Sequence, residues 1–150
     1  MKNTTTIQTI ANWFLAKESM THKKLQKLSY YSVAWGWALM NHGVARDGKF
    51  EAWVHGPVSP ILYQKYRDNG WNDLTRLKSA PELPDDITEL LEAVWLTYGS
   101  KSGNELEALS HSEAPWVKAR SGLKADARSS NLIKTSDMRE YYQSIKSSEY

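Results

Sequence analysis

The sequence predicts a mainly α fold, formally α+β, forming a single compact domain of about six or seven helices with one small β-hairpin. Apolar residues recur at helical spacing along most of the chain. Residues that cap helices precede several of these stripes, and one Asp-Gly pair between short apolar runs marks a single hairpin turn. Because 150 residues is a usual size for one domain, residues 1–150 are expected to fold together.

Two apolar helices are predicted at the start of the chain. Ile7, Ile10 and Phe14 lie on one face of the first helix, and the threonines before Ile7 are its candidate caps. Thr21 is expected to cap a second helix that runs to about Met40. Apolar side chains occupy most of the circumference of this second helix, so we expect it in the middle of the fold.

A short hairpin is predicted to follow the second helix. Residues 44–46 are expected to pair with residues 50–55 around an Asp-Gly turn at residues 47–48. The Gly-Pro pair at residues 56–57 is then expected to end the strand. Because two strands alone are marginally stable in water, the hairpin should pack against helices.

The later helices are indicated chiefly by their first residues. Ser59 as N-cap, with Pro60 at the first helical position, predicts a helix that Gly70 ends. Residues 71–84 have the composition of a loop. The remaining predicted starts are a capping box of Asp86 with Glu89, a second of Ser102 with Glu105, Pro115 at the head of a short helix, and Ser136 as the cap of the last helix.

The composition gives no sign of a catalytic or metal site. The chain has no cysteine, which excludes disulfides and thiolate ligands and is typical of the reducing cytoplasm, where we expect the protein. The four histidines do not stand at metal-ligand spacing. Glycine patterns that bind phosphates are absent, and no apolar run approaches membrane-spanning length. We therefore expect no cofactor, no metal and no membrane partner.

Positive charge gathers in two segments of the sequence. Lys23, Lys24 and Lys27 form a basic edge on the second helix, and residues 118–134 carry five basic residues against the single acid Asp126. Solvated helix faces explain such runs, whereas nucleic-acid binding is the functional alternative. The second segment lacks the interleaved aromatic residues on which bases stack, and a net charge of +2 does not by itself indicate nucleic acid.

Four segments of the sequence, taken together, carry a family resemblance. They are KLQKLSYY at 24–31, FEAWVHGPV at 50–58, LYQKYR at 62–67 and GNELEALSHSEAPWVKAR at 103–120. In this order they resemble the Panacea, or SocA-like, antitoxin domain family, which is also met as a phage-associated protein of the GepA type. Ser110 stands where the family often has Thr, so the hydroxyl is retained.

The resemblance implies a mainly helical domain that works without catalysis. It implies an antitoxin of a toxin–antitoxin system, often carried by prophages, that binds and neutralises a protein toxin encoded by the adjacent gene. At least one family member instead delivers its toxin to a Clp-type protease, so an ATP-dependent protease is a second candidate partner. Operator DNA is a third, because antitoxins often regulate their own operons.

Strand alternation offers candidates for the surface that binds a partner. Trp53 and His55 fall on the face of the predicted strand opposite its apolar residues, and Lys65 and Arg67 follow on the next helix. We therefore predict these four as partner-binding residues. Other residues within or beside the matching segments are expected to be structural: Tyr30, Trp35 and Trp116 in the core, and His111 and Pro115 at a junction between two helices.

The leading hypothesis from the sequence is a non-enzymatic antitoxin that binds its toxin directly. A nucleic-acid-binding regulator and a proteolytic adaptor are the alternatives. An enzyme built on His55 or His111 is disfavoured, because no partner for His55 is evident in the sequence and the nearby hydroxyl of Ser59 is better used as a helix cap.

Overall fold

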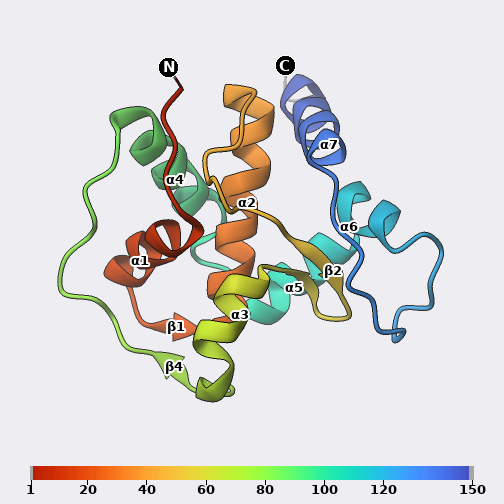
Figure 1. Ribbon diagram of the computed structural model, residues 1–150, viewed down its shortest axis with the longest axis horizontal. Helices are drawn as coiled ribbons and strands as arrows, with labels where there is room; N and C mark the ends of the chain where they lie inside the picture. Colours follow the sequence, from red (N-terminus) through yellow and green to blue (C-terminus); the bar gives the residue numbers. More distant parts are fainter. Residues whose placement is uncertain (1, 149–150) are drawn as a thin grey trace.

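The computed structural model describes residues 2–148 and has a mainly α fold, as the sequence predicts (Figure 1). Within this part of the chain there are seven α-helices, one 3₁₀ helix (η1) and two sheets of two strands. In chain order the elements are α1 (Ile7–Lys17), β1 (Met20–Thr21), α2 (His22–Met40), β2 (Glu51–Trp53), β3 (Gly56–Val58), α3 (Pro60–Tyr66), η1 (Arg67–Asn69), β4 (Asp73–Leu74), α4 (Asp85–Tyr98), α5 (Gly103–His111), α6 (Ala114–Ala119) and α7 (Thr135–Ser148).

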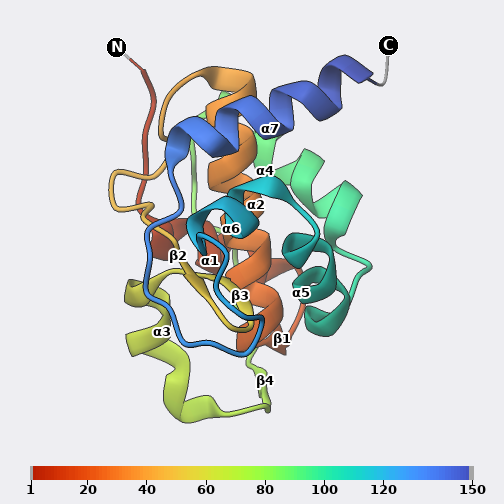
Figure 2. The same ribbon diagram turned by 90° about the vertical axis from the view of Figure 1, so that its right-hand side faces the viewer.

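Helix α2 runs through the middle of the molecule, as its apolar circumference predicts. Helices α1 and α4 lie on one side of it, and α7 and the β2–β3 hairpin lie on the other (Figures 1 and 2). The Thr21 hydroxyl accepts a hydrogen bond from the Lys24 amide at 3.2 Å, which confirms the predicted cap. Because α2 is covered along most of its length, its side chains connect nearly every other element.

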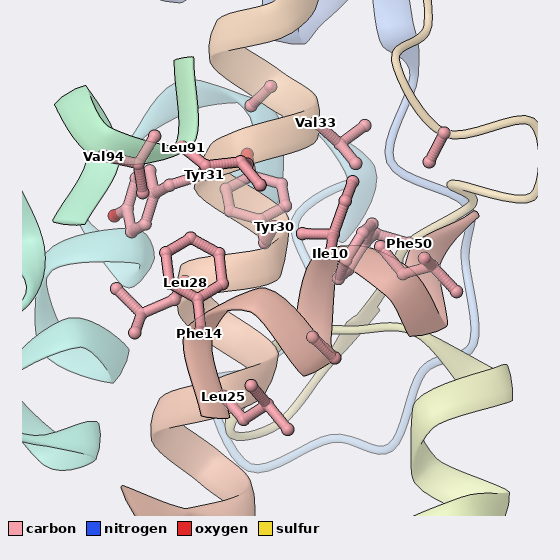
Figure 3. Packing of buried hydrophobic residues seen from close by; sticks show 14 of the residues in the cluster. Ile10, Phe14, Leu25, Leu28, Tyr30, Tyr31, Val33, Phe50, Leu91 and Val94 are labelled. Atoms are coloured by element: carbon pink, nitrogen blue, oxygen red, sulfur yellow. The ribbon is translucent and has the colours of Figure 1, made fainter. Parts of the chain in front are cut away.

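The core forms where α1, α2 and α4 meet. Figure 3 shows Ile10 and Phe14 of α1 facing α2, with Leu91 and Val94 of α4 closing the same space. Tyr31 of α2 is completely buried there and stacks on Tyr98 of α4, with 4.1 Å between the ring centroids. Trp35 of α2 packs against this cluster, and Tyr30 and Trp116 are buried, so all three residues predicted for the core contribute to it.

The predicted pairing of residues 44–46 with 50–55 is wrong. Strand β2 pairs instead with β3, so that the Gly-Pro expected to end the strand forms the partner strand. Residues 44–46 pair with the N-terminal segment, where the Thr5 amide donates to the Val44 carbonyl at 2.7 Å. The Thr6 hydroxyl accepts from the Thr9 amide at 3.2 Å, which confirms a threonine as the cap of α1. The Asp47 carboxylate accepts from the Ile7 amide at 2.7 Å and so joins the start of α1 instead of belonging to a hairpin.

Other local differences have equally local reasons. Strand β4 lies within the stretch predicted as a loop, and it pairs with β1 to form a second small sheet. Helix α4 begins after Pro84 without a side-chain cap, so the predicted capping box of Asp86 and Glu89 is wrong. The capping box of Ser102 and Glu105 is confirmed. Ser136 lies inside α7, one residue after its first residue, rather than capping it.

A buried carboxylate joins three helices. Glu113, just before α6, accepts hydrogen bonds from the hydroxyls of Tyr31 in α2 at 2.7 Å and Tyr142 in α7 at 2.9 Å. The Tyr142 hydroxyl also lies 3.3 Å from that of Tyr30. Burial raises the pKa of Glu113, although both tyrosine hydroxyls oppose the shift. This network ties α7 to the centre of the fold.

We expect Glu113→Ala to lower the free energy of unfolding by about 2–4 kcal/mol, because two buried tyrosine hydroxyls would lose their acceptor. Urea unfolding followed by circular dichroism measures this. The control is Glu140→Ala, which removes an exposed carboxylate from α7 and should change stability by less than about 0.5 kcal/mol. Equal stabilities of the two variants would contradict a structural role for the network.

Candidate functional site

The hairpin of β2 and β3 depends on a glycine at its turn. Gly56 has a φ of +102°, which a residue with a side chain rarely adopts. A Cβ at this position would lie 2.9 Å from Cε of Lys27 and 3.1 Å from Oγ of Ser110. The hairpin therefore reaches α2 and α5 so closely that only glycine fits between them.

An amide side chain fixes the residue that follows the hairpin. Gln26 of α2 accepts from the Ser59 amide at 2.8 Å and donates to the Ser59 carbonyl at 3.2 Å. The Ser59 hydroxyl accepts from the Leu62 amide, confirming its role as the cap of α3. Because Ser59 is fully buried and its hydroxyl is used in the cap, a nucleophilic role beside His55 has no support.

The second sequence motif packs on the first. Trp116 donates from its indole nitrogen to the Trp53 carbonyl at 2.9 Å, and Arg120 donates to the Ala52 carbonyl at 3.0 Å. The ring of His111 stacks on Trp116 at 4.0 Å, which places His111 at the junction of α5 and α6 as predicted. Most of the motif residues therefore hold the hairpin against the helices.

Each of the two basic segments contains one buried basic residue. Lys27 is 1% exposed, and Arg120 is 2% exposed. Arg120 donates to the carbonyls of Lys124 and Ala127 and so fastens the segment after α6 beside the hairpin. Lys23 forms an ion pair with Glu107 at 2.7 Å. Lys27 and Arg120 are thus used inside the fold, whereas Lys118, Lys124, Arg128 and Lys134 of the second segment are exposed.

Lys27 is a buried amine with a perturbed pKa. Its Nζ donates to the Pro57 carbonyl at 3.2 Å. Burial lowers its pKa to about 7; Glu107 opposes this shift and Lys23 adds to it. Burial, with the charge of Lys27, also lowers the pKa of the neighbouring His22 to about 4. At neutral pH His22 is therefore uncharged, and Lys27 is balanced between its two protonation states.

The structure brings three of the four predicted site residues to one face. The ring of Trp53 packs edge-on against Tyr63 of α3, with 4.7 Å between centroids. His55, at the turn between the strands, is 63% exposed along its side chain and lies 3.2 Å from the Glu107 carboxylate. Arg67 is exposed at the start of η1. Lys65 is also exposed, but it does not line either hollow described below.

Two hollows adjoin the Trp53–Tyr63 pair, and we call the surface that contains both the hairpin face. The inner hollow has a volume of about 280 Å³, and the outer hollow about 700 Å³. The inner hollow is lined by His22, Lys23, Gln26, Lys27, Trp53, Val58, Tyr63, Arg67, Gly70 and Trp71. The outer hollow is lined by Trp53, Val54, His55, Tyr63, Asp126, Arg128, Ser129 and Ser130. Figure 2 shows the hairpin, α3 and the segment after α6 on this side of the molecule.

Sequence reasoning missed Tyr63, Trp71 and the segment 126–130. Tyr63 and Arg67 are four residues apart, so they share one side of the α3–η1 turn, and that spacing was visible in the sequence. Trp71, which is 74% exposed, gave no signal of its own because its neighbours are loop residues. The position of 126–130 depends on the buried Arg120, which no local pattern revealed.

The hairpin face combines aromatic and basic side chains. Among residues 2–148 no group of His, Asp or Glu side chains is arranged to hold a metal ion. None of the helices in that part of the chain combines the length and apolar character needed to cross a bilayer. What the face offers is aromatic rings, exposed or hydrogen-bonded cations and two concave areas.

Comparison with known proteins identifies the family. A sequence model described as Antitoxin SocA-like, Panacea domain, matches residues 25–117. The chain belongs to this family. Antitoxin SocA of Caulobacter vibrioides (strain NA1000 / CB15N) is 33% identical over an alignment of 126 positions, and the match covers 71% of this chain. The aligned part spans 66% of the length of that relative. No solved structure matches the chain significantly.

We expect Gly56→Ala to destabilise this member of the Panacea family by about 2–4 kcal/mol, because strain at positive φ adds to crowding against Lys27 and Ser110. Gly122→Ala is the matched control: its φ is +78°, but no atom lies within 4 Å of an added Cβ. The control should cost about 1 kcal/mol. Urea unfolding compares the two, and equal losses would show that the hairpin does not approach α2 closely.

We expect the stability of the wild-type chain to rise, relative to Lys27→Met, as the pH increases from 7 to 10. The unfolded chain keeps the Lys27 proton up to its ordinary pKa of 10.5, whereas the folded chain releases it near 7. Between these values the unfolded state binds more protons, so the free energy of unfolding increases with pH. The relative gain should be on the order of 1–4 kcal/mol. The control Lys78→Met changes an exposed lysine, so its free energy of unfolding should vary with pH as in the wild type. If the free energies of Lys27→Met and wild type varied in parallel with pH, the burial of a titrating amine would be contradicted.

Proposed function

We propose that this chain is an antitoxin that works in the cytoplasm by binding a protein toxin encoded by the adjacent gene. The observation that carries this proposal is membership of the SocA-like Panacea family. The similarity to Antitoxin SocA supports the same role. We further propose that neutralisation is non-enzymatic and results from covering a surface that the toxin needs.

The hairpin face is the surface that we propose for toxin binding. Trp, Tyr and Arg are the residues that most often dominate the energy of protein interfaces. This face brings Trp53, Tyr63, Trp71 and Arg67 together around one hollow. His55 stands at the tip of the hairpin beside them, and Lys65 lies outside the hollows, where we propose a peripheral contact.

The nucleic-acid alternative is weakened by where the basic side chains lie. Proteins that bind DNA through its backbone do so with exposed Lys and Arg. Here Lys27 and Arg120 are buried, and Lys23 and Lys24 form ion pairs with Glu107 and Glu18. The other basic residues of the second segment, Lys118, Lys124, Arg128 and Lys134, are exposed, but that segment lacks interleaved aromatic residues on which bases could stack. We therefore favour a protein partner over operator DNA. Delivery of the toxin to an ATP-dependent Clp-type protease is a second route to neutralisation, and the experiment below separates it from blocking.

We expect the wild-type chain to restore growth when it is co-expressed with the toxic product of the adjacent gene. Trp71→Ala and Arg67→Ala should each weaken binding of that toxin at least about tenfold, because both remove exposed side chains from the proposed interface. Growth rescue and the dissociation constant by calorimetry measure the two effects. Leu96→Ala is the matched control, since Leu96 is 87% exposed but lies on α4 and lines neither hollow.

The outcomes separate the parts of the proposal. A neighbouring gene that is not toxic, or a toxin that the wild-type chain does not neutralise, would refute the antitoxin role. If the wild-type chain restores growth but Trp71→Ala and Arg67→Ala bind the toxin as tightly as the wild type, the hairpin face is not the binding surface, whereas the antitoxin role stands. If the toxin level falls in the presence of this chain only when an ATP-dependent protease is also present, neutralisation works by delivery to the protease. A toxin level that stays constant supports blocking.

A further inference from the structure

The inner hollow has an unbalanced charge. Its lining includes the basic side chains of Lys23, Lys27 and Arg67, and no Asp or Glu is among the described residues that line it. Lys23 is partly neutralised from behind by Glu107, which also lies 3.2 Å from His55. Arg67 has Asp68 at 3.9 Å, an exposed arrangement that contributes little. The hollow is therefore electropositive on its solvent side.

Lys27 is a buried amine that also lines this hollow. Buried charges are normally paired with an opposite charge, because removing an ion from water costs several kcal/mol. Lys27 donates only to the neutral carbonyl of Pro57 among the hydrogen bonds that the structure gives for its Nζ. Since the surrounding dielectric is low, a carboxylate placed near this amine would interact with it more strongly than in water.

The walls of the inner hollow fit a protein side chain better than a larger ligand. Its volume of about 280 Å³ is slightly below the range of roughly 300–1,000 Å³ for small-molecule pockets. Trp53 and Trp71 both line it, and the exposed Trp71 ring already lies 5.0 Å from the Lys23 ammonium. Aromatic walls around a positive floor match the methylene stem and carboxylate of a Glu or Asp.

We propose that the inner hollow receives the carboxylate of an acidic side chain from the toxin, with Trp53 and Trp71 beside its stem, Lys27 beneath it and Arg67 at the rim. This inference rests on the proposed antitoxin function and specifies its chemistry. It assigns Lys27 a role as a binding residue that the fold alone does not require.

Binding of an acidic side chain should change the protonation of Lys27. A carboxylate beside Lys27 favours its charged form, so binding should raise the pKa of Lys27 above about 7. The other charged or titratable groups around this amine are His22 and Lys23 of α2, Glu107 and His111 of α5, His55 of the hairpin turn and Arg67 of η1. Only a variant of Lys27 itself isolates its share from theirs.

Calorimetry of the chain with the purified toxin at pH 8, in buffers with different ionisation enthalpies, tests the proposal. The wild type should take up roughly half a proton or more on binding, because Lys27 is mostly neutral beforehand. Lys27→Met should remove that uptake and weaken binding about 10- to 100-fold. Lys78→Met, an exposed lysine that lines neither hollow, should match the wild type in both respects.

A variant of Arg67, at the rim of the inner hollow, tests the proposal even if Lys27→Met does not fold. Arg67→Gln should weaken binding about 3- to 10-fold, and a double-mutant cycle with Glu or Asp substitutions in the toxin should identify one strongly coupled acid. Toxin binding without proton uptake, with equal affinities for wild type and Lys27→Met, would overturn this inference and leave the antitoxin role intact. Absence of any toxin binding by the wild type would refute both.

Discussion

The need to cover α2 on all sides is the constraint on which the rest of the structure depends. A helix that is apolar around most of its circumference is stable in water only when other elements surround it. Helices α1, α4, α5 and α7 and the β2–β3 hairpin supply that cover. Helix α2 also carries buried polar side chains, and Gln26, Lys27 and Tyr31 bond to Ser59, Pro57 and Glu113, respectively.

The residues that identify the family are mostly the ones that join elements. Gly56 allows the hairpin to approach α2 and α5, Trp116 holds it from α6, and Glu113 links α6 to α2 and α7. The same segments also supply many of the residues around the hollows, among them Lys27, Trp53, Tyr63 and Arg67. The segments that hold the hairpin against the helices therefore also shape the proposed contact surface.

Local signals predicted local structure, and contacts distant in sequence account for the errors. The caps at Thr21, Ser59 and Ser102 were predictable because each bonds an amide three residues away. The hairpin was misplaced because the Asp47 carboxylate bonds the Ile7 amide, 40 positions earlier in the chain. Lys27 looked like part of a solvated basic run, since nothing near it in sequence shows that Gly56 and Pro57 cover it.

Under the proposed binding mode, the burial of Lys27 lowers the stability of the free chain and strengthens binding of an acidic partner for the same physical reason. Lys27 is taken out of water by the hairpin, and its one neutral acceptor does not offset the loss of hydration. If a partner supplies a carboxylate to the inner hollow, most of that desolvation has already occurred before association, so the ion pair forms with less additional loss. The hollow would then have little affinity for a neutral side chain of the same size, and the strain stored at Lys27 would act as a means of selecting an acidic partner.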